Sequence, residues 1–152
     1  QREEGFLSEL AARFPDIKVL SSNQHGGATR DTALAASQNL LNRYRTQVDG
    51  IFTPNESTTA GMLIALNNNG LGGGKVRLIG FANSQKFVEA LQHQDLQGLI
   101  LQDPVKMGYL GVKTIVESLQ GKKVSPAVDT GVVLATAENL KDPTVAALLP
   151  SP

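Results

Sequence analysis

Neutral amide side chains stand at the ends of short apolar segments of the sequence. Asn55 follows the segment 48–53 (VDGIFT), and Gln102 ends the segment 96–102 (LQGLILQ). A carboxamide donates hydrogen bonds through its nitrogen and accepts them through its oxygen, so one amide can serve two hydroxyl groups of a ligand. This chemistry suits a polyhydroxyl solute. It suits catalysis poorly, since it supplies neither a nucleophile nor a general base.

The same residues also fit a purely structural role. Asn55 and Ser57 open a predicted helix, and asparagine and serine are among the preferred N-cap residues. Gln102 also fits a polar strand end, and Arg2 fits a solvated charge on a helix. From the residues alone, both interpretations stay open.

An alternating series of helices and strands has to position these amides. Apolar patterning and turn residues predict strands over 16–21, 48–53, 76–81, 96–102 and 129–135. They predict helices over 1–13, 31–45, 55–66, 84–92, 104–121 and 143–149. Thr29, with Thr32 three positions later, is predicted to cap the second helix.

This alternation predicts an α/β fold in one domain over residues 1–152. Helices between successive strands imply a mostly parallel sheet with helices on both faces, which gives three layers in the order α/β/α. In open sheets of this kind, ligands bind beyond the carboxyl ends of the strands. The amides fall at those ends.

Composition excludes several classes of function. The chain has 14 Lys+Arg, 14 Asp+Glu, two His and no Cys. Zero net charge argues against a nucleic-acid partner, since such binding relies on a basic surface. Without Cys there are no disulfides or thiolate metal sites, and two histidines are too few for most His-rich sites. We therefore expect no metal and no cofactor.

Motifs of the common enzyme classes do not occur. The sequence has no G-x-S-x-G elbow, no Walker A motif and no H-E-x-x-H motif. The glycine run 70–74 precedes a strand instead of joining a strand to a helix, so it fits a loop and not a phosphate cradle. Glu56 and Asp103 are the only acids at the strand ends, both beside cap positions. We therefore expect a protein that is not an enzyme.

Several short motifs, taken in order, resemble the C-terminal lobe of type I periplasmic sugar-binding proteins, the ribose-binding-like solute receptors of ABC transporters. The matching motifs, which span essentially the whole chain, are Arg2-Glu3-Glu4-Gly5-Phe6, Ser37-Gln38-Asn39-Leu40-Leu41, Phe52-Thr53-Pro54-Asn55-Glu56, Ile79-Gly80-Phe81, Leu101-Gln102-Asp103-Pro104, Lys106-Met107-Gly108-Tyr109, Asp129-Thr130-Gly131-Val132-Val133 and Glu138-Asn139-Leu140.

The resemblance implies a set of ligand contacts. An arginine, an asparagine and a glutamine of the family contact sugar hydroxyls, and they match Arg2, Asn55 and Gln102. Two positions depart from the family. Ala82 stands where an aspartate often accepts two sugar hydroxyl bonds, with Asn83 beside it as a substitute contact, and Ala28 stands where an aromatic ring often stacks on the sugar.

The resemblance also implies a function. It predicts the solute-binding component of an ABC importer, located in the periplasm, which binds a small sugar or related polyol between two lobes and docks on a membrane permease. The alternative is the effector-binding domain of a lac-repressor-like transcription regulator, which shares the fold.

Domain organisation follows from the same resemblance. The sequence begins inside a predicted helix, so we expect a fragment of a longer protein. Segment 104–121 is expected to belong to the opposite lobe in a complete receptor. An unpartnered apolar helix favours a homo-oligomer or a domain swap, and half a cleft favours very weak sugar binding by this chain alone.

Overall fold

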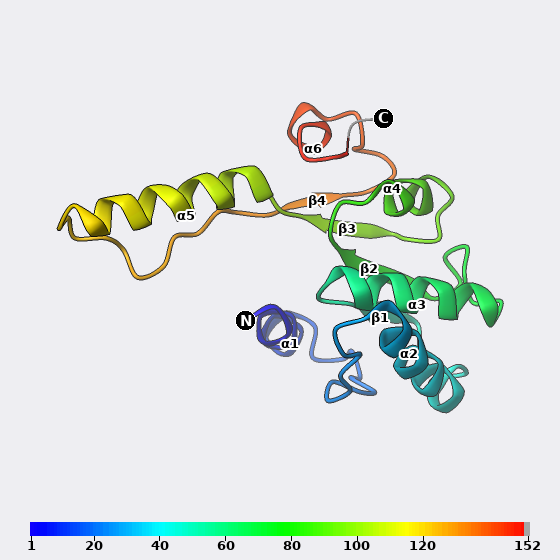
Figure 1. Cartoon of the computed structure of the whole chain (residues 1–152). Coiled ribbons are helices and arrows are strands. Elements are labelled where there is room, and N and C mark those ends of the chain that lie inside the picture. The colour runs from blue at the N-terminus through cyan, green and yellow to red at the C-terminus, as the bar shows by residue number, and fades with distance from the viewer. Residues whose placement is uncertain (151–152) are drawn as a thin grey trace.

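The computed structural model describes residues 1–150, and helices alternate with strands along most of the chain (Figure 1). The helices are α1 (Arg2–Arg13), α2 (Arg30–Tyr44), α3 (Glu56–Asn68), α4 (Gln85–Gln92), α5 (Pro104–Leu119) and α6 (Pro143–Ala146). The strands are β1 (Gly50–Phe52), β2 (Arg77–Phe81), β3 (Gly98–Leu101) and β4 (Val133–Ala135). The prediction of an α/β fold is confirmed.

The four strands form one mostly parallel sheet, also as predicted. Their order is β1-β2-β3-β4. The strands β1, β2 and β3 are parallel, with Phe52 opposite Ile79 and Phe81 opposite Ile100. β4 runs antiparallel to β3. The carboxyl ends of the three parallel strands therefore meet at one edge of the sheet.

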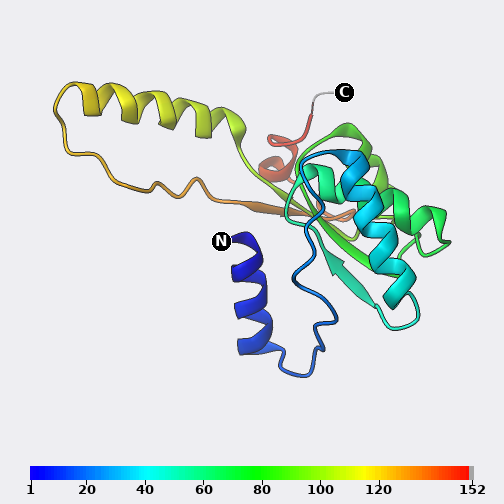
Figure 2. The ribbon, with the colours of Figure 1, turned by 60° about the horizontal axis from the view of Figure 1, so that its bottom comes forward.

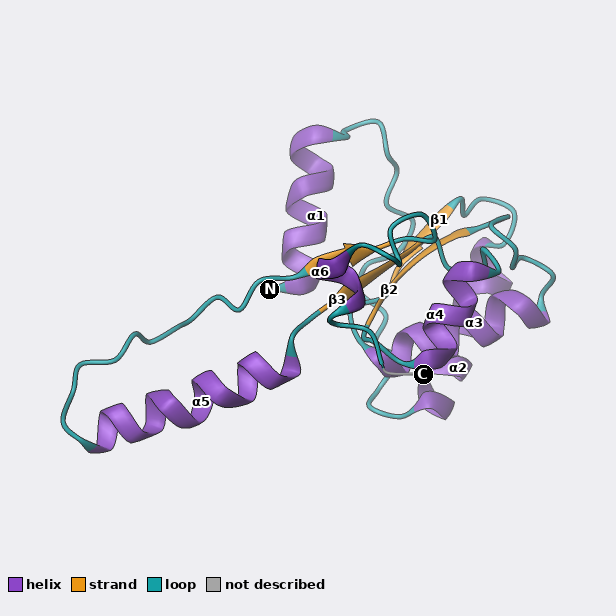
Figure 3. Cartoon of the chain, turned by 90° about the horizontal axis from the view of Figure 1, so that it is seen from above, coloured by secondary structure: helices purple, strands orange, loops and turns teal. Residues whose placement is uncertain are grey.

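The core lies on one face of this sheet. Leu78, Leu99 and Leu101 point to that face and are completely buried, in one cluster with Leu66 of α3 and Leu91 of α4. Seen from above, α2, α3 and α4 lie together on this side, and α1 lies on the other (Figure 3).

Glycine allows α2 and α3 to pack closely. A Cβ at Gly61 would lie 2.6 Å from the Leu34 nitrogen and 2.7 Å from the Ala33 carbonyl carbon. Both neighbours are backbone atoms, which cannot swing aside as a side chain would. This close packing brings the starts of α2 and α3 together at the same end of the molecule.

The other face of the sheet is only partly covered. Ile79 and Ile100 on this face are half-buried, and Leu134 is 49% exposed. The first half of α1 reaches this face at the carboxyl end of β1, where Phe6 stacks on Phe52 with ring centroids 4.7 Å apart. The second helical layer predicted from the sequence is therefore represented mainly by α1.

The helix caps follow the sequence closely. Thr29 caps α2, because its Oγ1 accepts a hydrogen bond from the Thr32 nitrogen at 3.2 Å. Thr32 Oγ1 in turn accepts one from the backbone nitrogen of Thr29. This reciprocal capping box satisfies two backbone donors that the helix itself leaves free. The predicted cap at Thr29 is confirmed.

The predicted strand over 16–21 is wrong. These residues form no strand, and the segment runs outside the sheet with Ile17 and Val19 largely exposed. Alternating apolar residues make a strand only where a neighbouring strand accepts their backbone hydrogen bonds. Within the described residues, β1 pairs only with β2 and offers its other edge to no strand.

α5 and the segment 120–132 extend away from the rest of the molecule as a long arm (Figure 2). None of the residues of α5 is buried, although its sequence is strongly apolar. Among residues 1–150, no helix combines the length and apolar character needed to cross a membrane.

Candidate functional site

Arg2 connects α1 to the carboxyl edge of the sheet. Its guanidinium carbon lies 3.9 Å from the centroid of the Phe81 ring, at the end of β2. Nη1 donates to the Pro54 carbonyl oxygen at 2.7 Å, and Nη2 donates to Gln102 Oε1 at 2.8 Å. One side chain therefore contacts the residues at or after the ends of β1, β2 and β3.

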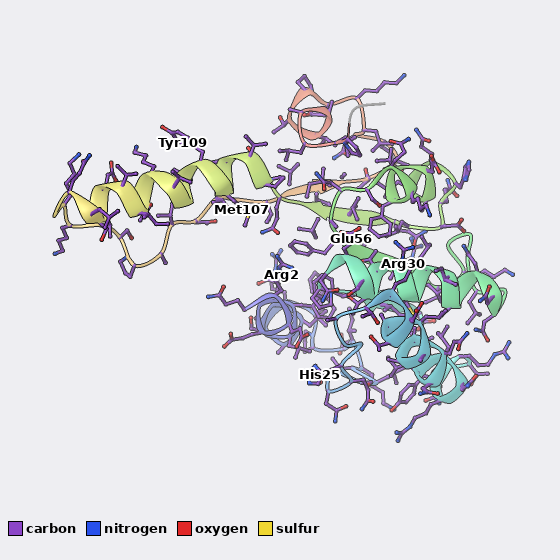
Figure 4. The ribbon with its side chains drawn as sticks, viewed as in Figure 1. Arg2, His25, Arg30, Glu56, Met107 and Tyr109 are labelled. Carbon is purple, nitrogen blue, oxygen red and sulfur yellow. The ribbon has the colours of Figure 1, made fainter. Side chains whose placement is uncertain are left out.

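The stacking of Phe6 on Phe52 holds α1 in the orientation that these contacts need. Phe6 lies one helical turn after Arg2, so both side chains project from the same side of α1. Figure 4 shows Arg2 between α1 and the body of the molecule. The predicted ligand contact at Arg2 therefore lies at the strand ends, although the sequence placed it on a helix outside the sheet.

Asn55 caps α3, and this fixes the orientation of its amide. Oδ1 accepts from the Thr58 nitrogen at 3.0 Å and from the hydroxyls of Ser57 and Thr58, each at 2.9 Å. Since a backbone N–H can only donate, the atom facing it must be the oxygen. Nδ2 has no acceptor among residues 1–150 and remains available to donate to a ligand.

Gln102 is oriented in the same way by Arg2. Because the guanidinium only donates, Gln102 Oε1 faces it and Nε2 points elsewhere, with no acceptor in the described part of the chain. Asp103, the next residue, caps α5 through a 2.8 Å bond from the Lys106 nitrogen. The amides of Gln102 and Asn55 therefore both have a nitrogen that is free to donate.

These hydrogen bonds show which amide atoms the protein itself already uses. Each amide was expected to donate to one ligand hydroxyl and accept from another. In the structure, protein groups already occupy the oxygens of Asn55 and Gln102. Asn55 and Gln102 therefore keep their amide nitrogens free to donate, and Gln102 Oε1 keeps a second lone pair.

Asn83 lies apart from this hydrogen-bonded group. Its Nδ2 donates to the Leu148 carbonyl oxygen at 2.9 Å, which ties the loop after β2 to the segment that follows α6. Ala82, which precedes it, has a φ of 109°, a backbone conformation uncommon for a residue with a side chain. The Asn83 nitrogen is therefore occupied in this structure.

Two hollows meet at Asn55. The larger, of about 630 Å³, lies between the starts of α2 and α3 and is lined by Ala28, Arg30, Asp31, Asn55, Glu56, Ser57 and Ala60. The smaller, of about 210 Å³, is lined by Glu3, Gln24, His25, Gly26, Gly27, Pro54, Asn55 and Thr58. Both are open to solvent, as expected for one wall of a cleft.

Arg30 and Glu56 are wall residues that the sequence did not single out as binding residues. Both lie in the first turn of a helix that starts at the strand-end edge (Figure 4). The sequence could have indicated them, because each directly follows an N-cap residue, Thr29 or Asn55. Side chains in the first turn of a helix lie at the same end of the helix as its cap. Among residues 1–150, no group of three acidic or histidine side chains is placed to hold a metal ion.

The fold and the site define a class of protein. An α/β lobe with amides and an arginine at the carboxyl edge of a parallel sheet has polar groups at the place where sheets of this kind bind ligands. Residues 1–123 match the family described as periplasmic binding protein domain. The chain belongs to this family.

Individual relatives agree with that assignment. The chain is 30% identical over 128 residues to the ribose import binding protein RbsB of Haemophilus influenzae, a match that covers 84% of this chain and 41% of the relative. A carbohydrate transporter solute binding protein of Agrobacterium radiobacter, solved in complex with D-arabinose, has a TM-score of 0.85 and 34% identity, covering 96% of this chain and 48% of that one.

A second solved structure is similar to the same extent. An ABC transporter solute binding protein of Agrobacterium vitis, solved with bound D-fucose, has a TM-score of 0.85 and 29% identity, covering 97% of this chain and 49% of that one. The chain therefore spans about half the length of these solved relatives and less than half of the ribose import binding protein.

Proposed function

We propose that this chain is the ligand-binding C-terminal lobe of a periplasmic solute receptor of an ABC importer, which binds a small sugar or related polyol and catalyses no reaction. The observation that carries the proposal is that Arg2 joins Gln102, 100 residues away in sequence, to the carbonyl of Pro54, which directly precedes Asn55. Relatives with bound D-arabinose and D-fucose support a sugar as the ligand class.

The chemistry of the three side chains fits sugar hydroxyls. Asn55 Nδ2, Gln102 Nε2 and the remaining N–H groups of Arg2 all donate, and each sugar hydroxyl oxygen has lone pairs to accept. A hydroxyl that accepts from these donors still has its own proton to donate elsewhere. Ala82 supplies no carboxylate for that proton at the end of β2, whereas Asp31 and Glu56 line the larger hollow beside Asn55.

The second lobe of the receptor would supply the other wall. We propose that segment 104–121 packs against that lobe in a complete receptor, because α5 carries a strongly apolar sequence yet buries no residue here. The share of the relatives that the chain spans, about half, supports this reading. Closure of two lobes around a ligand is a common hinge motion, and the closed form would dock on the permease.

A regulator's effector-binding domain shares the fold and is the other candidate function. The names of the relatives reported above, an import protein and two transporter solute binding proteins, favour the transport receptor. The proposal includes a periplasmic location, since a receptor for an importer has to meet its ligand outside the cytoplasm.

A titration followed by NMR tests the proposal directly. Uniformly ¹⁵N-labelled chain is titrated with D-ribose, D-arabinose, D-fucose and xylitol, and the side-chain amide signals of Asn55 and Gln102 are followed. A complete receptor with a Kd near 1 μM that keeps half of its binding free energy in one lobe gives a Kd of roughly 1 mM. We expect millimolar binding with shifts confined to the two amides and their neighbours.

Two results would contradict the proposal. Shifts that scatter over the surface would show nonspecific contact, and the absence of any shift for all four ligands would show that the edge binds no polyol. Micromolar affinity would instead contradict the expectation that one wall binds weakly.

A further inference from the structure

Two buried threonines lie directly beneath the proposed sugar site. Thr59, in the first turns of α3, is completely buried, and Thr53, directly after β1, is 5% exposed. Their hydroxyl oxygens lie 3.0 Å apart. Hydroxyls this deeply buried are retained only where they are hydrogen-bonded, so their partners indicate what the pair holds in place.

Thr59 joins the two segments that carry the site. Its Oγ1 donates to the Asn55 carbonyl oxygen at 2.7 Å and accepts from the Phe81 nitrogen at 3.0 Å. Ile79, opposite Phe52, is the last β2 residue paired with β1, and Phe81 lies two residues beyond it. At the end of β2, the Thr59 hydroxyl therefore accepts the backbone hydrogen bond that a neighbouring strand would otherwise accept.

Thr53 holds the Thr59 hydroxyl from the other side. Thr53 Oγ1 lies within 3.0 Å of Thr59 Oγ1 and 3.3 Å of the Ile79 carbonyl oxygen. Because Thr59 uses its only proton on Asn55, Thr53 is the residue that donates between the two hydroxyls. The pair forms a short chain from the end of β1 through Thr59 to the backbone of Asn55.

The surrounding backbone is shaped to admit this side chain. A Cβ at position 80 would overlap Thr59 Cγ2, so Gly80 is needed for α3 to approach β2 at this point. Ala82, with a φ of 109°, directly follows the residue that Thr59 holds. A backbone conformation of this kind persists only where neighbouring contacts determine it, and the bond from Phe81 is one such contact.

We propose that Thr59 is a positioning residue for sugar binding, which sets the spacing between Asn55 and the turn at Phe81 and Ala82, with Thr53 as its support. The guanidinium of Arg2 in turn lies over the ring of Phe81. A shift of α3 against β2 would therefore move the Asn55 donor relative to the Arg2 donors. The inference rests on the proposed function, since the side chains it positions are the proposed sugar contacts.

The experiment compares four variants of the full chain in the NMR titration with D-ribose and D-arabinose, together with the exchange rate of the Phe81 amide hydrogen. Thr59→Val keeps the shape and removes the hydroxyl, Thr59→Ser keeps the hydroxyl, and Thr53→Val removes only the supporting bond. Val76→Ala is the control, because Val76 is buried directly before β2, at the opposite edge of the sheet.

We expect Thr59→Val to weaken sugar binding by about tenfold, which is the usual effect of one lost hydrogen bond, and to speed exchange at Phe81. Thr59→Ser restores both, and Val76→Ala lowers stability without changing affinity. Wild-type affinity in Thr59→Val, or an equal loss in Val76→Ala, overturns the inference and leaves the proposed function intact.

Two further outcomes are distinguishable. If Thr59→Val does not fold, Thr53→Val carries the test: binding about threefold weaker is expected for a lost supporting bond, and unchanged affinity overturns the inference. If the wild-type chain binds none of the sugars, the proposed function fails, and the positioning role fails with it.

Discussion

Arg2 donates a hydrogen bond from Nη2 to Gln102 Oε1 over 2.8 Å, across 100 residues of sequence. This bond fixes α1 against the end of β3 and sets the direction of the Gln102 amide. It leaves Nε2 outward as a donor, just as the cap of α3 leaves Asn55 Nδ2 as a donor. Both amides therefore have a free nitrogen because their oxygens bond to protein groups.

The first prediction separates the two roles of Asn55. Asn55→Asp keeps an oxygen for the Thr58 N–H and so keeps the cap, since aspartate caps helices as well as asparagine does. It removes the Nδ2 donor, and we expect sugar affinity to fall about tenfold with unchanged stability. NMR titration and urea unfolding measure the two quantities.

Asn55→Ala is the matched control for this prediction. It loses the cap and the donor together, so both affinity and stability fall, the latter by about 1 kcal/mol. If Asn55→Asp binds sugar as well as the wild type, Asn55 is only a cap.

The second prediction concerns the pair of Arg2 and Gln102. Gln102→Glu keeps an oxygen for the guanidinium and adds opposite charge, so α1 stays docked on the sheet. It replaces the outward donor with an oxygen, and we expect the affinity for D-ribose and D-arabinose to fall about tenfold. Fluorine NMR of a 4-fluorophenylalanine label at Phe6 reports whether α1 remains docked.

Gln102→Leu is the comparison for that experiment. It removes both the donor and the partner of Arg2, so affinity falls and the Phe6 signal shifts toward its position in an undocked helix. An unchanged affinity in Gln102→Glu would remove Gln102 from the proposed site.

The third prediction restores the acid that the resemblance leads one to expect. Ala82→Asp places a carboxylate at the end of β2, and a hydrogen bond to a charged acceptor contributes about 1.5–3 kcal/mol. We expect sugar affinity to rise at least tenfold. Ala82 packs against the core, so the charged side chain should lower stability, which urea unfolding measures beside affinity.

Ala82→Asn controls for shape in this experiment, because it carries a similar side chain without the charge. A rise in affinity for Asn equal to that for Asp would show that charge is not the cause. No rise for either variant would place the ligand away from position 82.

The sequence predicted the parts of this fold that depend on neighbouring residues. The cap at Thr29 and the strand that contains Leu78 are local patterns of turn chemistry and apolar character, and both are confirmed. The strand over 16–21 was wrong because a strand also needs a partner, which local pattern does not supply. The fold class and the order of the elements were therefore predictable, whereas the lack of a partner strand for residues 16–21 was not.

The sequence named candidate site residues but did not predict their hydrogen bonds. Arg2 and Gln102 were named from the resemblance, yet their contact over 100 residues follows only from the packed fold. Thr59 gave no signal, because a threonine inside an apolar helix resembles many others until its distance to the Phe81 nitrogen is known. The amide of Asn83 was named as a contact, and its bond to Leu148 depends on the far end of the chain.

The fourth prediction concerns pH and α6, the helix that precedes the segment bonded to Asn83. The bond from the Thr144 backbone N–H lowers the pKa of Asp142, which caps α6, below its ordinary value of 3.8. A pKa lowered in the folded state gives stability that is present above pH 3.8 and is lost as the pH falls through the folded pKa. Acid should therefore weaken α6.

Asp142→Asn tests this directly, since asparagine still caps but does not titrate in this range. We expect the difference in urea unfolding midpoint between wild type and Asp142→Asn to be largest near neutral pH and to close below pH 3.8. A difference that stays constant over this range would show that the cap is not linked to protonation.

The fifth prediction concerns the exposed arm. The apolar residues Val105, Tyr109, Val112, Val116 and Leu119 follow each other at alternating spacings of four and three along α5 and are all exposed. This spacing places them in one stripe along the helix, the pattern that pairs helices in coiled coils. In the isolated chain, a second copy is the only available partner, so we expect concentration-dependent dimers in sedimentation velocity.

Val112→Lys puts a charge in the middle of that stripe, and we expect it to shift the monomer–dimer equilibrium toward monomer by tenfold or more, since burying an unpaired charge is costly. Lys113→Ser, one position along and outside the stripe, removes a charge and should leave the equilibrium unchanged. A wild-type chain that stays monomeric at all concentrations would show that α5 does not associate with itself. Dimers that persist in Val112→Lys would place the contact elsewhere, with the half-buried sheet face around Ile79 and Ile100 as the next surface to test.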